Sequence, residues 1–137
     1  MTRFLLIVNY DNGGVITEPM LSWDPADIRA HLAYYEALNK KLVESGEYVS
    51  GEALAWPEHT KVVRSNGQAA PVVTDGPYAE AKEMLAGFQI VDVDSIERAV
   101  EIAALVSAVP GPGGVPLQQP IEVRPVMQGD EDLGVDL

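Results

Sequence analysis

The stretch GFQIVDVDSIERAVEIAALV, residues 87–106, combines the two kinds of segment that decide the fold of this chain. Residues 87–93 largely alternate apolar and polar side chains, a pattern typical of a strand with one buried face. Asp94 is the predicted N-cap of the helix that follows, and Glu97 completes a capping-box pattern. The positions expected on the inward face of this helix are Ile96, Val100, Ala103 and Val106. The stretch therefore predicts a strand that leads directly into an amphipathic helix.

A similar pair of elements is predicted nearer the start of the sequence. Residues 4–8 form a short apolar run, as expected of a strand buried on both faces. Asp24 and Pro25 are typical of the first positions of a helix, and Gly46 is typical of the left-handed position that ends one. The inward positions expected of this helix are Ile28, Leu32, Tyr35, Leu38 and Leu42.

Further strands are predicted at residues 48–56, 62–64, 70–74 and 121–127. The second and third of these flank Asn66-Gly67, a pair that favours the positive φ angles of a tight hairpin turn. Residues 78–85 could form a short helix, and the Pro- and Gly-rich residues 110–120 are expected to be a loop.

The order of these elements predicts an α+β fold, namely a ferredoxin-like subunit with a mainly antiparallel sheet covered on one face by two long helices. The other face of the sheet would remain open. Several residues of the predicted strands are too apolar to face water unaided: Leu6, Val8, Val63, Phe88 and Ile90. We therefore expect a homodimer closed through the sheets.

The chain has 137 residues, with 9 basic and 21 acidic side chains (9 − 21 = −12) and no cysteine. We divide it into one domain, residues 1–127, and an acidic C-terminal tail, residues 128–137, which has too few apolar side chains to favour an ordered structure. The lack of cysteine excludes disulfides, thiol nucleophiles and Cys-based metal sites. The negative charge disfavours binding to nucleic acid and to anionic membranes. Because no apolar run is long enough for a signal peptide or a membrane span, we expect a cytoplasmic protein.

Residues 74–83, TDGPYAEAKE, resemble the "DGPF" signature of the YCII-related (YciI-like) family, with Tyr78 in place of the phenylalanine. Further family-like pieces stand in the right order along the chain, at residues 4–7, His31-Leu32, 51–54, 87–93 and 122–125. The resemblance covers nearly all of residues 1–127. It implies a ferredoxin-like subunit of the dimeric α+β barrel superfamily, and it does not imply one reaction.

His31 is the first candidate for chemistry, because it lies on or beside the inward face of the predicted helix, where a polar ring needs a partner. A buried histidine that is bonded to a carbonyl is the structural alternative. The resemblance implies a His–Asp pair, in which Asp75 would orient the His31 ring and raise its basicity. Capping of the local turn is the alternative role of Asp75, and Asp27, one helical turn before His31, is a second candidate partner.

Four other residues are candidate ligand-binding groups. Glu52 could point into the interior of a dimer barrel, and Tyr78 could present its hydroxyl to a pocket. Lys82 and Arg124 could each bind an anionic group of a substrate. The alternatives are contact with water for Glu52 and Tyr78, a surface ion pair for Lys82 and an interface ion pair for Arg124. We expect no metal and no cofactor, because the two histidines of the chain lack the spacing of a metal site.

Two functions of different kinds remain. The first is a cofactor-independent enzyme for a small molecule, or the relic of one, in which His31 and Asp75 perform proton transfer or elimination; the family that the chain resembles includes a dehydrochlorinase. The second is a non-catalytic ligand-binding or regulatory module, because proteins of that family are often associated with extracytoplasmic-function sigma factors. The acidic tail would then be a docking segment for a sigma-factor-linked partner.

Overall fold

The structure is a computed structural model that describes residues 1–10, 20–76 and 84–129 of the chain. Its helices are α1 (Pro25–Glu44) and α2 (Ile96–Ser107), with short 3₁₀ helices η1 (Met20–Ser22), η2 (Pro57–His59) and η3 (Pro112–Gly114). Its strands are β1 (Thr2–Tyr10), β2 (Tyr48–Ala53), β3 (Lys61–Arg64), β4 (Val72–Asp75), β5 (Met84–Val93) and β6 (Ile121–Pro125). The predicted α+β class is confirmed. No helix in the described part of the chain is long and apolar enough to cross a membrane.

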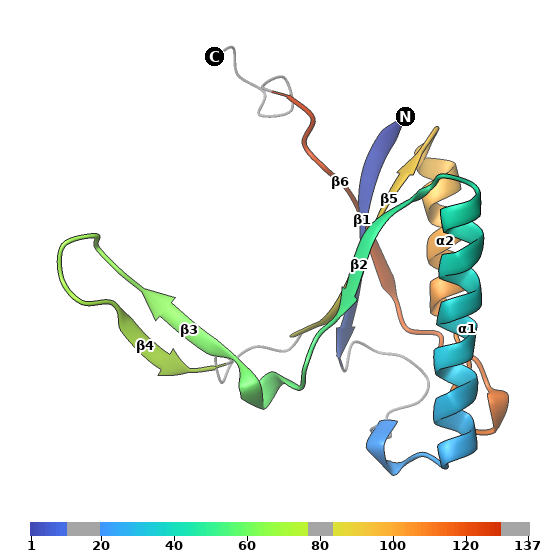
Figure 1. Cartoon of the computed structure of the whole chain (residues 1–137), viewed down its shortest axis with the longest axis horizontal. Helices are drawn as coiled ribbons and strands as arrows, with labels where there is room; N and C mark the ends of the chain where they lie inside the picture. Colours follow the sequence, from blue (N-terminus) through green and yellow to red (C-terminus); the bar gives the residue numbers. More distant parts are fainter. Residues whose placement is uncertain (11–19, 77–83, 130–137) are drawn as a thin grey trace.

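Four strands form one antiparallel sheet in the order β2-β5-β1-β6. Since α1 connects β1 to β2 and α2 connects β5 to β6, the elements of this layer follow one another as βαββαβ. Both helices cover the same face of the sheet (Figure 1). α1 has 20 residues and α2 has 12, which is an ordinary helix length, so only α1 is long.

The main core lies between the sheet and the two helices. Its buried members are Phe4, Leu6, Leu38, Leu42, Val91, Val93, Ala99, Ile102, Ala103 and Val106. On α1 the inward face includes His31, whereas Leu32, predicted to be inward, is more than half exposed. On α2 the predicted inward residues Ile96 and Val100 are about half exposed. The predicted inward residues Ala103 and Val106 are buried, together with Ala99 and Ile102. The small side chains of the two alanines let the helix lie close to the sheet.

The caps of both helices differ in detail from the prediction. Asp24 is at the N-cap position of α1, but its side chain makes no capping hydrogen bond. The N-cap of α2 is Ser95 rather than Asp94, and its Oγ accepts a hydrogen bond of 3.2 Å from the backbone N–H of Arg98. Ser95 thus satisfies a free amide group of the first turn, the role predicted for its neighbour.

The sheet face away from the helices carries an apolar strip along its centre. Side chains alternate between the faces of a strand, so Leu5 and Ile7 of β1 lie opposite the core side. Their cross-strand partners in β5 are Ile90 and Phe88, and all four side chains are only partly buried. We call these four residues the apolar strip and this face the open face.

Three other residues predicted to need cover lie elsewhere. Leu6 and Val8 pack against the helices, and Val63 is in β3. The strands β3 and β4 pair with one another, and not with the main sheet, in a hairpin that projects from it (Figure 1). We call residues 61–75 the arm.

The hairpin predicted around Asn66-Gly67 is confirmed, but its turn is wider than predicted. Residues 65–71 separate the two strands. Asn66 Oδ1 accepts hydrogen bonds from the backbone N–H groups of Gln68 and Ala69 at 2.9 and 3.0 Å, and of the pair only Gly67 has a positive φ, 81°. An Asx-type turn therefore closes the hairpin in place of a two-residue turn. The short helix predicted at residues 78–85 lies outside the described residues as far as residue 83, and β5 begins at Met84.

Candidate functional site

His31 is buried in contact with residues from three parts of the chain. Only 7% of its surface is exposed. The ring of Trp23 contacts it edge-on with centroids 5.5 Å apart, and the ring of Tyr35 does so at 5.3 Å. Nδ1 of His31 lies 2.9 Å from the carbonyl oxygen of Pro110, in the segment after α2. We call these four residues the histidine cluster. His31 is thus a buried histidine bonded to a backbone carbonyl, as expected of a residue with a structural role.

The bond to Pro110 fixes the tautomer of the His31 ring. A carbonyl oxygen can only accept a hydrogen bond, so Nδ1 carries the proton. In the neutral ring, Nε2 then has a free lone pair. This is the form in which a histidine can take up a proton from another molecule.

The surroundings of the cluster disfavour charge. Burial lowers the pKa of His31 below its ordinary value of 6.5, and the hydrogen bond with Pro110 opposes this effect. Burial also raises the pKa of Tyr35 to about 12, with a smaller contribution from Tyr34. Both rings are therefore neutral at pH 7, and a proton taken up by His31 would be held weakly and returned readily.

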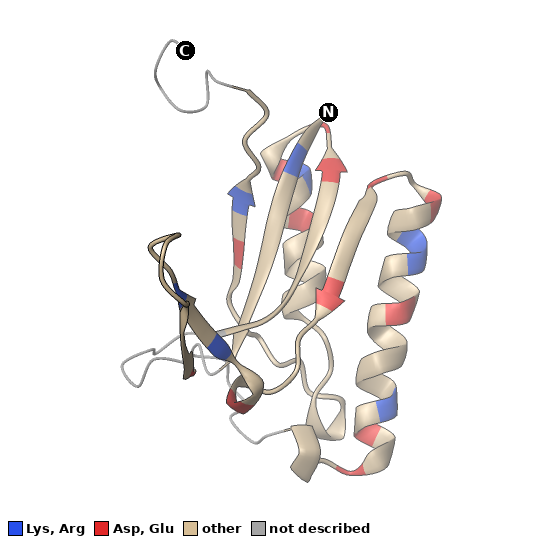
Figure 2. Cartoon of the chain, turned by 60° about the vertical axis from the view of Figure 1, so that its left-hand side comes forward, with Lys and Arg blue, Asp and Glu red and all other residues tan. Residues whose placement is uncertain are grey.

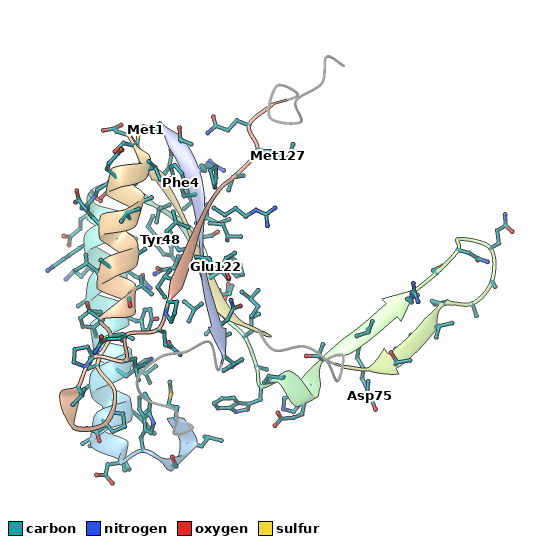
Figure 3. The ribbon with its side chains drawn as sticks, turned by 180° about the vertical axis from the view of Figure 1, so that it is seen from behind. Met1, Phe4, Tyr48, Asp75, Glu122 and Met127 are labelled. Atoms are coloured by element: carbon teal, nitrogen blue, oxygen red, sulfur yellow. The ribbon has the colours of Figure 1, made fainter. Side chains whose placement is uncertain are left out.

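Asp75 lies at the base of the arm, at the end of β4 (Figure 3). Its side chain is 84% exposed and pairs with Lys61, its cross-strand neighbour. His31 bonds to Pro110 instead. The described chain does not bring His31 and Asp75 together, and the predicted pair stays a prediction.

Glu52 and Arg124 both belong to the open face of the sheet. Glu52 is opposite Phe88 in β5, and Arg124 is opposite Leu5 in β1. Both side chains are exposed, on the two edge strands of the sheet and on either side of the apolar strip. They share a face with one another but not with the histidine cluster, which is on the helix side.

The two remaining predicted ligand-binding residues, Tyr78 and Lys82, lie outside the described residues. Within residues 1–10, 20–76 and 84–129, no three His, Asp or Glu side chains are grouped closely enough to hold a metal ion.

The sequence pattern did not identify Pro110 as the partner of His31. The two residues are 79 positions apart, and the group that binds is a backbone carbonyl, which every residue has. The only sequence signal for this partner was the Pro- and Gly-rich composition of residues 110–114. Such a segment has backbone carbonyl groups outside helices and long strands, which can accept hydrogen bonds from side chains.

Comparison with known proteins gives the family. The sequence model of the YCII-related domain matches residues 3–114, most of the chain. The chain belongs to the YCII-related family. The matched segment of this YCII-related chain contains the whole histidine cluster, Glu52 and Asp75, and it ends before Arg124.

The YCII-related chain is also similar to an uncharacterised protein of Rhizobium meliloti (strain 1021). The two sequences are 29% identical over 106 residues, which are 77% of this chain and 80% of the relative. Because that relative is uncharacterised, the function of this YCII-related chain has to be inferred from its own residues.

Proposed function

We propose that this YCII-related chain acts on a small molecule by cofactor-independent proton transfer or elimination, or is the relic of such an enzyme, with His31 as its acid–base residue. The observation that supports this is the 2.9 Å hydrogen bond between Nδ1 and the carbonyl oxygen of Pro110. The bond directs the free lone pair to Nε2. The lowered pKa of His31 keeps the ring neutral, and so able to accept a proton, at neutral pH.

The proposed step uses one ring nitrogen. In an elimination, Nε2 of His31 takes a proton from a carbon next to an electron-withdrawing group, the C–H electron pair forms a double bond, and the leaving group departs with its own electron pair. In a proton transfer, the same nitrogen returns the proton to a different atom of the substrate. The Pro110 carbonyl orients the ring in either case. Asp75 could help to orient the His31 ring only if its carboxylate gave up the ion pair with Lys61.

We also propose that the ferredoxin-like subunit forms a homodimeric α+β barrel, with the open faces of two sheets packed together. The apolar strip supports this, because covering its four neighbouring apolar side chains with a second sheet lowers the free energy of the protein. In such a dimer Glu52 and Arg124 would face the interior and could bind polar groups of the ligand.

A screen of small carbonyl and halogenated compounds in D₂O tests the acid–base proposal, with NMR used to follow both deuterium incorporation and loss of the leaving group. We expect His31→Gln to slow turnover of any substrate found by about a hundredfold or more, the usual range for loss of a general base. His59→Gln is the matched control, because His59 is exposed on η2. Circular dichroism of each variant separates loss of chemistry from loss of folding. Undiminished turnover by a folded His31→Gln variant would contradict the proposal.

A non-catalytic ligand-binding or regulatory module is the second candidate, and the position of Asp75 favours it. Asp75 pairs with Lys61 on the arm rather than with His31, so the residues thought to form a catalytic pair have separate structural partners. The partner would be a sigma-factor-linked protein, with the acidic tail as docking segment. Pull-down with and without residues 128–137 tests the tail; unchanged recovery of the partner would remove the tail from this candidate function.

A further inference from the structure

The arm, residues 61–75, exposes apolar side chains on both of its faces. Val63 and Val73 are direct cross-strand partners on one face, and 59% and 55% of their surfaces are exposed. Val72 lies on the other face, opposite Arg64, and is 60% exposed. A two-stranded ribbon is at best marginally stable in water. The arm therefore has apolar surface on both sides that a further element would stabilise by covering.

The arm is held in shape at its base and at its tip. At the base, Lys61 pairs with Asp75, and the backbone N–H of Gly76 donates to the carbonyl oxygen of Thr60 at 2.9 Å. At the tip, the side chain of Asn66 accepts two backbone hydrogen bonds. A ribbon fixed in this way presents its valines as a preformed surface, which lowers the entropy lost on binding.

The position of the arm indicates what covers it. The arm projects on the side of the main sheet that faces away from the helices, as Figures 1 and 3 show from opposite directions. This is the side of the apolar strip. A second copy that covered the strip with its own open face would therefore lie beside the arm.

The charges of the arm fit the same occupant. The arm contains Lys61, Arg64 and one acidic residue, Asp75, so its formal charge is 2 − 1 = +1, whereas the whole chain carries −12. Figure 2 shows basic residues on the strands of the arm, and both acidic and basic residues on the helices and the main sheet. Arg64 makes no ion pair within the described residues, and the exposed carboxylates of Glu52 and Glu122 lie beside the apolar strip together with the exposed guanidinium of Arg124. An acidic second copy would attract the arm.

We propose that the arm docks on a second copy of this chain, beside the apolar strip of that copy, so that two arms clasp the two subunits reciprocally about a twofold axis. This inference rests on the homodimer proposed above and adds a second contact surface to it. The valines of the arm are then buried against the second copy, and the interface extends beyond the two sheets.

Sedimentation of three variants tests the arm separately from the dimer. Val63→Asp combined with Val73→Asp places charge on the arm without altering the core. Val100→Asp is the matched control, because Val100 is 52% exposed on α2, away from the arm. Phe88→Asp disrupts the apolar strip. We expect the dissociation constant of the dimer to rise at least about tenfold in the arm variant and in Phe88→Asp, and to stay unchanged in Val100→Asp.

Cross-linking identifies the docking surface directly. Because the chain has no cysteine, Val63→Cys provides a single thiol for a benzophenone label. This variant is mixed with isotope-labelled wild-type chain, and the cross-linked peptides are identified by mass spectrometry. We expect links between unlabelled and labelled copies, ending on the main sheet or the loops beside it. Links confined to one copy, or no links, would overturn the proposal.

The sedimentation outcomes separate the two proposals. A wild-type chain that remains a monomer at every concentration overturns both the sheet dimer and the arm contact. A dimer whose dissociation constant is unchanged in the arm variant overturns the arm contact alone. A dimer that is weakened by the arm variant and by Phe88→Asp, but not by Val100→Asp, supports both.

Discussion

Nδ1 of His31 lies 2.9 Å from the carbonyl oxygen of Pro110, and this hydrogen bond joins helix α1 to the segment that follows α2. Trp23 belongs to a second, smaller core with Val109, next to Pro110, and Leu117. The residue that is the candidate base thus also holds the end of the helical layer together. Stability and chemistry at this site are therefore coupled.

Removing the His31 ring should destabilise the fold. His31→Ala loses the hydrogen bond to Pro110 and the contacts with two aromatic rings, and we expect a decrease of about 2–4 kcal/mol in the free energy of unfolding. Urea denaturation measures this value. His59→Ala, at an exposed position, should change it by less than about 0.5 kcal/mol. Equal stability of the two variants would contradict a structural role for the cluster.

The stability of the chain should fall in mildly acidic solution because of His31. Burial lowers its pKa in the folded state, so below the unfolded value of about 6.5 the unfolded chain binds more protons than the folded chain. The free energy of unfolding therefore keeps the full contribution of this residue above about pH 6.5 and loses it as the pH falls toward the lower folded pKa.

NMR titration of the two histidines, together with denaturation as a function of pH, measures this effect. The His31→Phe variant should lack the contribution of His31 to the pH dependence of the free energy of unfolding. The His59→Gln variant should retain that contribution. Asp75→Asn should leave the titration of His31 unchanged, because Asp75 pairs with Lys61. A His31 that titrates at or above about 6.5 would be inconsistent with the buried cluster.

The ion pair between Glu47 and Arg98 should stabilise the contact of the residue before β2 with α2. Nε and Nη2 of Arg98 donate to the two carboxylate oxygens of Glu47 at 2.8 and 2.9 Å, and only 14% of the Glu47 side chain is exposed. Because the arginine side chain is 39% exposed, we expect Arg98→Ala to cost only about 1–2 kcal/mol. Glu101→Ala, which removes the more exposed partner of Arg98, should cost less than about 0.5 kcal/mol.

The same pair should respond to acid. The hydrogen bonds from Arg98, more than the single bond from Ser45, lower the pKa of Glu47 below its ordinary value of 4.5, against the opposing effect of burial. Its contribution is therefore complete above about pH 4.5 and is lost as the pH falls through the folded pKa. Denaturation curves of wild type and Glu47→Gln should converge in that range; parallel curves would show that the pair does not control this pH dependence.

Substitutions at the centre of the core should lower the stability of the protein much more than substitutions on the adjacent surface. Leu42 is 2% exposed, and Leu42→Ala should cost about 2–5 kcal/mol because it removes buried methyl groups and leaves a cavity. Val43, the next residue of α1, is 60% exposed, and Val43→Ala should change stability by less than about 0.5 kcal/mol. Thermal denaturation of both variants checks the assigned face of α1, and the reverse ranking would show that it is rotated.

Much of the element order could be predicted because it depends on local patterns. The alternation in residues 87–93 gave a strand that the structure extends back to Met84, and the turn residues around Asn66 gave the hairpin. The error of one position at the cap of α2 has a local cause as well. Asp94 and Ser95 are both good N-caps, and the choice depends on where the preceding strand ends.

The inward face of α1 shows where local patterns are insufficient. Hydrophobicity favoured Leu32 as an inward residue, and the structure buries its neighbour His31 instead. The polar ring is tolerated because the Pro110 carbonyl satisfies Nδ1 and aromatic rings pack around it. The sequence placed His31 on or beside the inward face, but it did not supply the partner that makes burial favourable.

By itself, the sequence determined the α+β class, the order of strands and helices, the hairpin and the resemblance to the YCII-related family, because periodicity, turn residues and short motifs are local properties of a chain. Only the tertiary structure decided that His31 bonds to Pro110, that Asp75 pairs with Lys61 on a projecting arm, and that Glu52 and Arg124 share the open face. These relationships depend on strand register and on packing between residues far apart in the chain. A backbone carbonyl, which is the partner of His31, is present at every position and so has no signature in the order of side chains.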